Sequence, residues 1–251
     1  MKDYSSYAKG SISMSKDTLF IDTVESIINM YDISYIVESG TYMGTGSTRT
    51  IADILVKNKK AIKKFYTIEV DNTFFRKAKK NLKKYSFVEP IWGISVDPEE
   101  AIKFVNTDEA IVHHEKYPEV FIDTLNNPVE FYTNEIRGQF SRTSLKPNLW
   151  DKIFKQKGLA QEKFRTNVFN ELLPKIKNNN PIILLDSAGG IGLLEFNTVM
   201  KYMSNDEFII ILDDIHHLKH FRSLAYIENS PNFTIINKSI QDGWVIANYK
   251  P

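Results

Sequence analysis

Cysteine is absent from the 251 residues of this chain. Disulfide bridges and thiolate-bound zinc are therefore excluded, and any metal ion must be held by oxygen or imidazole ligands. The chain also lacks an excess of either charge, since 32 Lys and Arg residues face 31 Asp and Glu residues. A domain that binds nucleic acid usually carries a strongly basic surface, so we expect no nucleic-acid partner.

Long apolar runs are missing as well. None approaches the roughly 20 residues that a membrane-spanning helix needs, and the first residues, Met-Lys-Asp-Tyr-Ser-Ser, lack the apolar centre of a signal peptide. We therefore expect a cytoplasmic protein without a membrane partner. A hydrophobic content of 42% is enough for a large core, and the length suits one large α/β domain or one domain with an insertion.

A glycine-rich segment is the most informative part of the chain. A mostly apolar run over 33–37 ends at Glu38, glycines follow at 40, 44 and 46, and a helical pattern begins at Ser47. This order predicts a buried strand that enters a turn where the backbone approaches a ligand closely. A second strand over 65–70 contains Glu69 near its end, where doubly wound nucleotide-binding folds place an acid that accepts hydrogen bonds from a ribose.

Strand and helix patterns alternate along most of the chain. A loose arm and a helix are predicted within 1–32, further strands over 87–92, 181–186 and 207–213, a helix near 216–228, and a closing antiparallel pair over 233–237 and 243–249. The pattern predicts a doubly wound, mostly parallel, Rossmann-like sheet with an antiparallel C-terminal strand pair. An aromatic-rich helical insertion over about 99–165 interrupts it. A lid and an interface, including a homodimer contact, are the two roles expected for this insertion.

Two segments carry a resemblance to a known family. Glu38-Ser-Gly-Thr-Tyr-Met-Gly-Thr-Gly46 and Tyr66-Thr-Ile-Glu-Val-Asp71 resemble the first two motifs of class I S-adenosylmethionine (SAM)-dependent methyltransferases. The glycine spacing is most similar to that of the metal-dependent O-methyltransferases of the catechol and sugar-modifying kind. The likeness covers about 35–98 and 181–250.

The resemblance implies a set of cofactor contacts. The methionine part of SAM would lie along the glycine-rich turn, with Glu38 or Thr41 near its ammonium group, and Glu69 would hold the ribose. Val70 would pack on the adenine, near the segment that begins at Gly93. The complete set is Glu38, Gly40, Thr41, Tyr42, Gly44, Gly46, Ser47, Glu69, Val70, Gly93 and Ser95.

Acids at the ends of two later strands indicate a metal site. Asp186 ends one predicted strand, and Asp213 and Asp214 end the next. Parallel strands bring their carboxyl ends to one edge, where three carboxylates would repel one another unless a divalent cation joined them. An all-oxygen ligand set suits Mg²⁺, and the resembled family holds its metal at these places. The alternative is that these acids cap the helices that follow.

The base of the reaction is not evident. The resembled enzymes have a Lys or an Asp shortly after the first metal-binding acid, whereas 187–193 contains no such group. His216 and Asp214 are the candidate catalytic residues, with His217 and His220 close by.

The predicted function is metal-assisted O-methylation of a small hydroxylated acceptor, such as a sugar or a natural-product intermediate. The alternatives are a metal-independent SAM-fold transferase and a non-catalytic SAM-binding protein.

Overall fold

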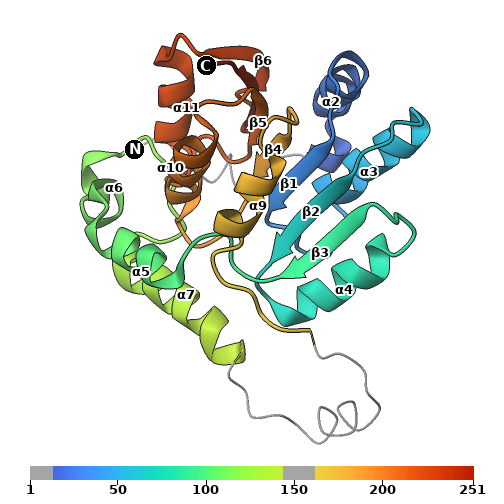
Figure 1. Ribbon diagram of the computed structural model, residues 1–251. Helices are drawn as coiled ribbons and strands as arrows, with labels where there is room; N and C mark the ends of the chain where they lie inside the picture. The colour runs from blue at the N-terminus through green and yellow to red at the C-terminus, as the bar shows by residue number, and fades with distance from the viewer. Residues whose placement is uncertain (1–13, 144–161) are drawn as a thin grey trace, which may run out of the picture.

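A seven-stranded sheet forms the centre of the molecule (Figure 1). The computed structural model describes residues 14–143 and 162–251. The strands are β1 (Tyr35–Ser39), β2 (Lys64–Glu69), β3 (Val88–Trp92), β4 (Ile182–Leu185), β5 (Phe208–Leu212), β6 (Phe233–Ser239) and β7 (Trp244–Tyr249). They lie in the order β3-β2-β1-β4-β5-β7-β6. The first five are mutually parallel, and β7 runs antiparallel to both of its neighbours. The predicted fold class is confirmed.

The helices lie on both faces of this sheet (Figure 1). They are the short η1 (Met14–Lys16) and η2 (His114–Lys116), and α2 (Thr18–Met30), α3 (Ser47–Lys57), α4 (Asn72–Leu82), α5 (Pro98–Thr107), α6 (Glu109–Val112), α7 (Pro128–Thr143), α9 (Val168–Ile176), α10 (Gly192–Met203) and α11 (Phe221–Asn229). Within the described ranges, none of them has the length and apolar character that a bilayer span requires.

Successive residues of the central strands enter two different cores. In β4, Ile183 and Leu185 belong to the core that includes α9 and α10, whereas Ile182 and Leu184 belong to the core that includes α2 and α3. Side chains alternate between the two faces of a strand, so a strand covered on both faces needs a continuous apolar run. The unbroken Ile-Ile-Leu-Leu sequence of β4 meets this requirement, and all four residues are buried.

The segment before α11 differs from the prediction. The helix expected near 216–228 begins only at Phe221. Asp214 has a φ of +54°, which ends the extended course of β5. The backbone around His217 is then held beside Phe121, whose N–H donates to the carbonyl of His216 and whose carbonyl accepts from Leu218. These bonds keep the first residues of the predicted helix in a turn.

The insertion adds helices to one of the two cores. Its described part contains α5, α6 and α7, which lie together at one side of the sheet (Figure 1). Val105, Ile111, Tyr132 and Ile136 are buried in the same core as α9 and α10. Residues 144–161 of the insertion lie outside the described residues, as do residues 1–13 of the predicted arm. The homodimer contact stays a prediction.

Candidate active site

A cavity of about 540 Å³ lies at the carboxyl ends of the parallel strands. Its volume is within the range of about 300–1,000 Å³ that is usual for small-molecule sites. The lining comes from the ends of β1 and β2 and the loops that follow them, from the loops after β3 and β4, and from α4, α7 and α10. The residues are Ser39, Gly40, Tyr42, Ile68, Glu69, Val70, Asp71, Phe74, Gly93, Ile94, Ser95, Asn134, Glu135, Asp186, Ser187, Ala188, Ile191 and Glu195.

The predicted cofactor residues divide into two groups. Gly40, Tyr42, Glu69, Val70, Gly93 and Ser95 line the cavity. Glu38, Thr41, Gly44, Gly46 and Ser47 are outside the lining. The structure therefore brings the ends of β2 and β3 to the cavity as predicted, but only part of the glycine-rich turn.

Gly40 is required by a close approach of two strand ends. Its φ is +100°, and a Cβ on it would lie 2.1 Å from the carbonyl oxygen of Asp186. A larger residue would thus push the end of β4 away from the end of β1. A different contact requires glycine at position 44, because a Cβ there would lie 2.8 Å from the side chain of Leu82 on α4. The glycine at 44 therefore serves the packing of the turn on α4.

Glu38 points into the protein and not into the cavity. Its carboxylate accepts hydrogen bonds of 2.6 Å from the hydroxyls of Ser47, Thr48 and Thr67. The residue has no exposed surface, and burial raises the pKa of its carboxyl. Glu38 thus joins β1 to β2 and to the start of α3, and the structure does not bring it to the place predicted for an ammonium group.

Glu69 is held by the backbone at the edge of the cavity. One carboxylate oxygen accepts from the N–H of Tyr42 at 2.6 Å, and the other accepts from the N–H of Asp71 at 2.8 Å. Burial raises the pKa of this carboxyl to about 7, although these two hydrogen bonds oppose the shift. Each oxygen keeps a second lone pair. The group is therefore oriented for a pair of hydroxyls such as those of a ribose.

Glu195 of α10 was missed by the sequence reasoning. It is fully buried beneath the cavity and accepts hydrogen bonds from Ser39 at 3.2 Å, from Ser187 at 2.6 Å and from Ser95. Burial raises the pKa of its carboxyl. One side chain thus ties together the ends of β1, β3 and β4. The only signal in the sequence is a single acid within the helical run over 192–203.

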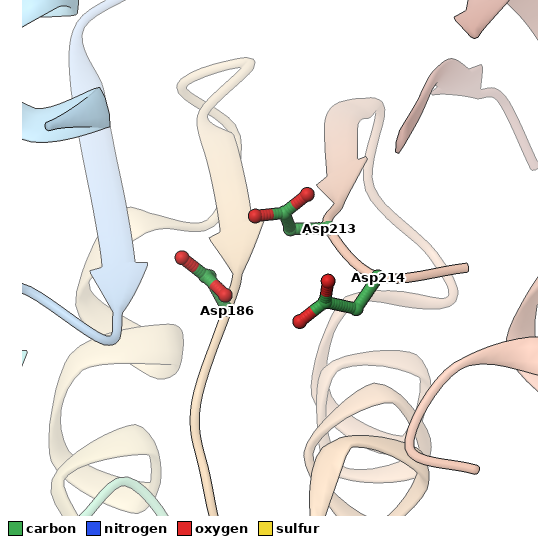
Figure 2. A group of neighbouring side chains, drawn as sticks. All are labelled: Asp186, Asp213 and Asp214. Atoms are coloured by element: carbon green, nitrogen blue, oxygen red, sulfur yellow. The ribbon is translucent and has the colours of Figure 1, made fainter. Parts of the chain in front are cut away.

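The three predicted metal ligands converge. Figure 2 shows Asp186, Asp213 and Asp214 pointing toward one another from the ends of β4 and β5. One carboxylate oxygen of each lies within 4.8 Å of the others. The predicted convergence is confirmed, and neither Asp213 nor Asp214 caps α11, which has no side-chain cap.

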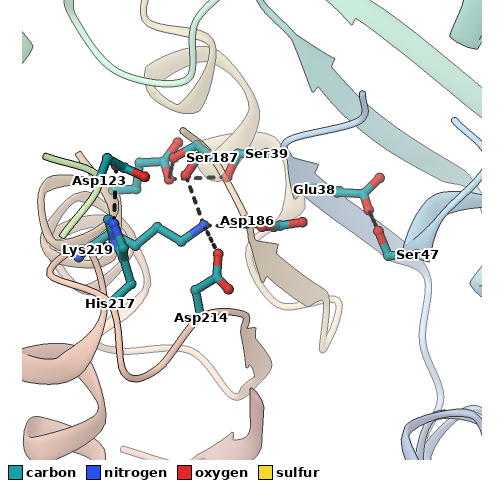
Figure 3. A network of polar contacts seen from close by, with 10 residues as sticks. Glu38, Ser39, Ser47, Asp123, Asp186, Ser187, Asp214, His217 and Lys219 are labelled. Atoms are coloured by element: carbon teal, nitrogen blue, oxygen red, sulfur yellow. Dashed lines mark hydrogen bonds and ion pairs between the residues drawn. The ribbon is translucent and has the colours of Figure 1, made fainter. Parts of the chain in front are cut away.

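Lys219 lies within this cluster and was also missed. Its Nζ is 2.8 Å from Asp214 and 3.2 Å from Asp186 (Figure 3). Burial alone would lower the pKa of Lys219, but the surrounding aspartates outweigh it and hold the pKa above its usual range. The Asp214 side chain is 52% exposed, and the attraction of Lys219 outweighs the effect of its partial burial, so the pKa of its carboxyl is lowered.

The other two aspartates respond differently. Burial raises the pKa of the Asp213 carboxyl well above its usual range, and the charges of Asp186 and Asp214 act in the same direction. The pKa of Asp186 is raised as well, mainly by burial and against the attraction of Lys219. Of the three aspartates, Asp214 is therefore the one whose carboxyl most favours the ionised form.

None of the described histidines lines the cavity. The Nε2 of His216 is 2.6 Å from the carbonyl oxygen of Ile240, on the turn between β6 and β7. His217 is 3.2 Å from Asp123 through Nε2, and its Nδ1 accepts from the N–H of Lys219. His220 is fully buried, which lowers its pKa well below the usual range. The structure thus does not bring His216, the predicted base, to the cavity.

Comparisons with known proteins add to the description of the fold. No protein-family model matches the chain. No curated protein matches it either.

Among solved structures, the chain is similar to an O-methyltransferase from Bacillus cereus in complex with SAH, at 12% identity and a TM-score of 0.48, over 98% of this chain and 87% of the other. It is also similar to a Methanococcus jannaschii fibrillarin pre-rRNA processing protein, at 12% identity and a TM-score of 0.45, over 94% and 75% of the two chains. An rRNA methylase from Streptococcus thermophilus is similar at 12% identity and a TM-score of 0.40, over 92% and 94%.

The strand order and the antiparallel C-terminal pair define a Rossmann-like, mostly parallel α/β fold. The three similarities concern the course of the chain and not its chemistry, which rests on the side chains of the cavity.

Proposed function

We propose that this protein is a SAM-dependent methyltransferase that acts on a small hydroxylated acceptor. The observation that carries the proposal is Glu69, which is held by two backbone N–H groups at the end of β2 and faces the cavity. In doubly wound folds an acid at this place binds the ribose hydroxyls of a nucleotide. The aromatic pair of Tyr42 and Phe74, with ring centroids 4.4 Å apart, adds an apolar surface for an adenine at the same end.

The charge of the cavity supports a cationic ligand. The described residues that line it include five acidic side chains and no Lys, Arg or His; the acids are Glu69, Asp71, Glu135, Asp186 and Glu195. SAM carries a sulfonium and an ammonium group, both of which a negative potential favours. The same potential disfavours the phosphates of a nucleic acid, which are bound by basic groups. The charge therefore favours SAM with a small acceptor.

The acceptor would lie beside α7 of the insertion. Asn134 and Glu135 line the cavity from this helix, opposite the glycine-containing loop after β4. Among the residues that the structure describes, no hydrogen bond or ion pair engages the Glu135 side chain, and burial raises the pKa of its carboxyl. A carboxylate with a raised pKa is a better proton acceptor than one in water. Glu135 and Asp186 are thus the two groups that we propose as acceptors for the proton of an acceptor hydroxyl.

The chemistry requires little else of the protein. SAM supplies an electrophilic methyl group, which passes to the acceptor oxygen and leaves S-adenosylhomocysteine. The cavity would hold the two reactants in line, which is the main source of rate in such a transfer. Lys219 stays protonated, so it orients Asp186 and does not itself remove a proton.

The metal-assisted form of this reaction fits the site less well. Asp186, Asp213 and Asp214 are near enough for a shared Mg²⁺, but the ammonium group of Lys219 already contacts two of them. We therefore favour a metal-independent transfer. A non-catalytic SAM-binding protein is the remaining alternative, and turnover separates it from an enzyme.

The test is a calorimetric titration of SAM and S-adenosylhomocysteine into the protein, with Mg²⁺ and again with EDTA. We expect micromolar binding of both ligands, unchanged by EDTA. A screen of hydroxylated acceptors with methyl-labelled SAM then follows. Absence of binding by either ligand would overturn the proposal, whereas binding without label transfer to any acceptor would favour the non-catalytic alternative.

A further inference from the structure

The ammonium group of Lys219 has all of its hydrogen-bonding capacity used within the acid cluster. Its Nζ is 3.2 Å from Asp186 Oδ1, 2.8 Å from Asp214 Oδ2 and 3.2 Å from the carbonyl oxygen of Ser187. A protonated lysine has three N–H donors, and here each has its own oxygen acceptor. Figure 3 shows the Nζ between the two aspartates and Ser187. All three N–H donors of Lys219 are therefore used by the two aspartates and the Ser187 carbonyl.

The position of Lys219 is set by its surroundings. Only 7% of its side chain is exposed. The backbone N–H of Lys219 donates to Nδ1 of His217. The ring of His217 packs against Phe121 of the insertion, with centroids 5.4 Å apart. The lysine stem passes Gly192, where an added Cβ would lie 2.9 Å from the Cβ of Lys219. A buried lysine with a packed stem cannot easily turn to solvent and vacate the cluster.

A divalent ion and this lysine compete for the same carboxylates. An ion such as Mg²⁺ or Ca²⁺ binds oxygen at about 2.0–2.6 Å, so it would have to lie close to Asp186 and Asp214 and therefore close to the ammonium group. Like charges repel at this short range, and screening by water is incomplete because the side chains of Lys219 and Asp186 are only 7% and 27% exposed, although that of Asp214 is 52% exposed. The ammonium group of Lys219, a side chain of the protein itself, already supplies a cation to the cluster.

We propose that Lys219 takes the place of a divalent metal in the acid cluster and acts as a positioning residue for Asp186, the member of the cluster that lines the cavity. The metal replacement is independent of the proposed function, whereas the positioning role rests on it. The inference predicts that the wild-type protein has no divalent-metal site here, and that deletion of the lysine charge creates one.

The experiment is a titration of Mn²⁺, followed by electron paramagnetic resonance, into wild type, Lys219→Met and Lys219→Arg. Lys238→Met is the matched control, because Lys238 forms an exposed ion pair with Glu228 at 2.8 Å. We expect no stoichiometric binding by wild type, by Lys219→Arg or by the control. Lys219→Met should bind one Mn²⁺ about a hundredfold or more tightly than wild type, since a buried like charge has been removed. Adding Asp213→Asn should weaken that binding.

Two results would overturn the inference. One is tight, stoichiometric Mn²⁺ binding by wild type that Asp213→Asn abolishes. The other is a folded Lys219→Met protein that binds Mn²⁺ no better than wild type. If Lys219→Met does not fold, the titration of wild type still decides whether the native cluster binds Mn²⁺. Lys219→Arg should retain the wild-type melting temperature. None of these readouts needs SAM, so failure of the proposed function would be seen separately in the calorimetric titration.

Discussion

Replacement of Glu69 by Gln tests the cavity most directly. The substitution keeps the size of the side chain but removes the charge and one acceptor oxygen. The wild-type carboxylate accepts from the N–H groups of Tyr42 and Asp71 at 2.6 and 2.8 Å, so the amide NH₂ of Gln must face one of these donors. A hydrogen bond to a charged group contributes about 1.5–3 kcal/mol, which corresponds to roughly a 10- to 150-fold loss of affinity for S-adenosylhomocysteine.

The pH dependence of binding gives a second, independent measure of the same group. Burial raises the pKa of Glu69 to about 7, so the carboxylate that binds hydroxyls is mostly formed at pH 8 and mostly protonated at pH 6. We expect the affinity of wild type for S-adenosylhomocysteine to fall by up to about tenfold from pH 8 to pH 6. In Glu69→Gln this part of the pH dependence should disappear.

The effect of Glu69 on folding has the opposite sign. Its pKa is higher in the folded protein, about 7, than the ordinary value of 4.5, so the folded state binds the proton more tightly. The stabilisation from this group is therefore complete below pH 4.5 and is lost as the pH rises through about 7. Stability and ligand affinity should consequently change in opposite directions between pH 6 and pH 8.

The assay is isothermal titration calorimetry of S-adenosylhomocysteine at pH 6, 7 and 8. Glu89→Gln serves as a matched control, because Glu89 lies on β3 in an exposed ion pair with Lys64. Binding to Glu69→Gln within twofold of wild type at pH 8 would refute the assignment of Glu69 as a ribose ligand. A wild-type affinity that is flat across this pH range would refute its ionisation near pH 7.

Two further substitutions test how the fold supports the site. Gly40→Ala should destabilise by about 3 kcal/mol or more in urea unfolding, because its Cβ would lie 2.1 Å from the Asp186 carbonyl oxygen, whereas Gly46→Ala, with nothing within 4 Å, should cost far less. Asp17→Ala should cost about 2–4 kcal/mol, since Asp17 caps α2 and accepts from the buried Trp244 Nε1–H at 2.6 Å. Asp17→Asn keeps only one of the two acceptor oxygens, which can serve the cap or Trp244 but not both, so it should cost less than Asp17→Ala. Equal stability of the two variants would contradict this reasoning.

Much of the fold could be read from local patterns. The apolar runs of the parallel strands predicted their burial on two faces. The glycine-rich turn predicted a close approach of backbone to a ligand, whereas the close approach that Gly40 makes is to the backbone of Asp186. The convergence of Asp186, Asp213 and Asp214 followed from the rule that parallel strands end at one edge. These features depend on residues near in sequence or on general properties of a sheet.

The direction of individual side chains needed the register of the strands. Glu38 is paired with Thr67 across β1 and β2, so the two side chains lie on the same face and form a hydrogen bond. That pairing turns the first acid of the glycine-rich segment inward, while Glu69 at the end of β2 meets the backbone of the turn and the cavity. A sequence pattern marks both acids as strand ends but does not distinguish their directions.

The cation of the acid cluster and the buried acid beneath the cavity were decided only by tertiary structure. Lys219 follows a turn where a helix was predicted. Phe121 pairs with that turn, and the ammonium group of Lys219 consequently lies between Asp186 and Asp214. Glu195 reaches Ser39 across 156 positions of the sequence. Local patterns in the sequence predict which strands exist and which acids end them. The packing of the insertion and α10 against the sheet decided which charges those acids meet, because such contacts join residues that no local pattern relates.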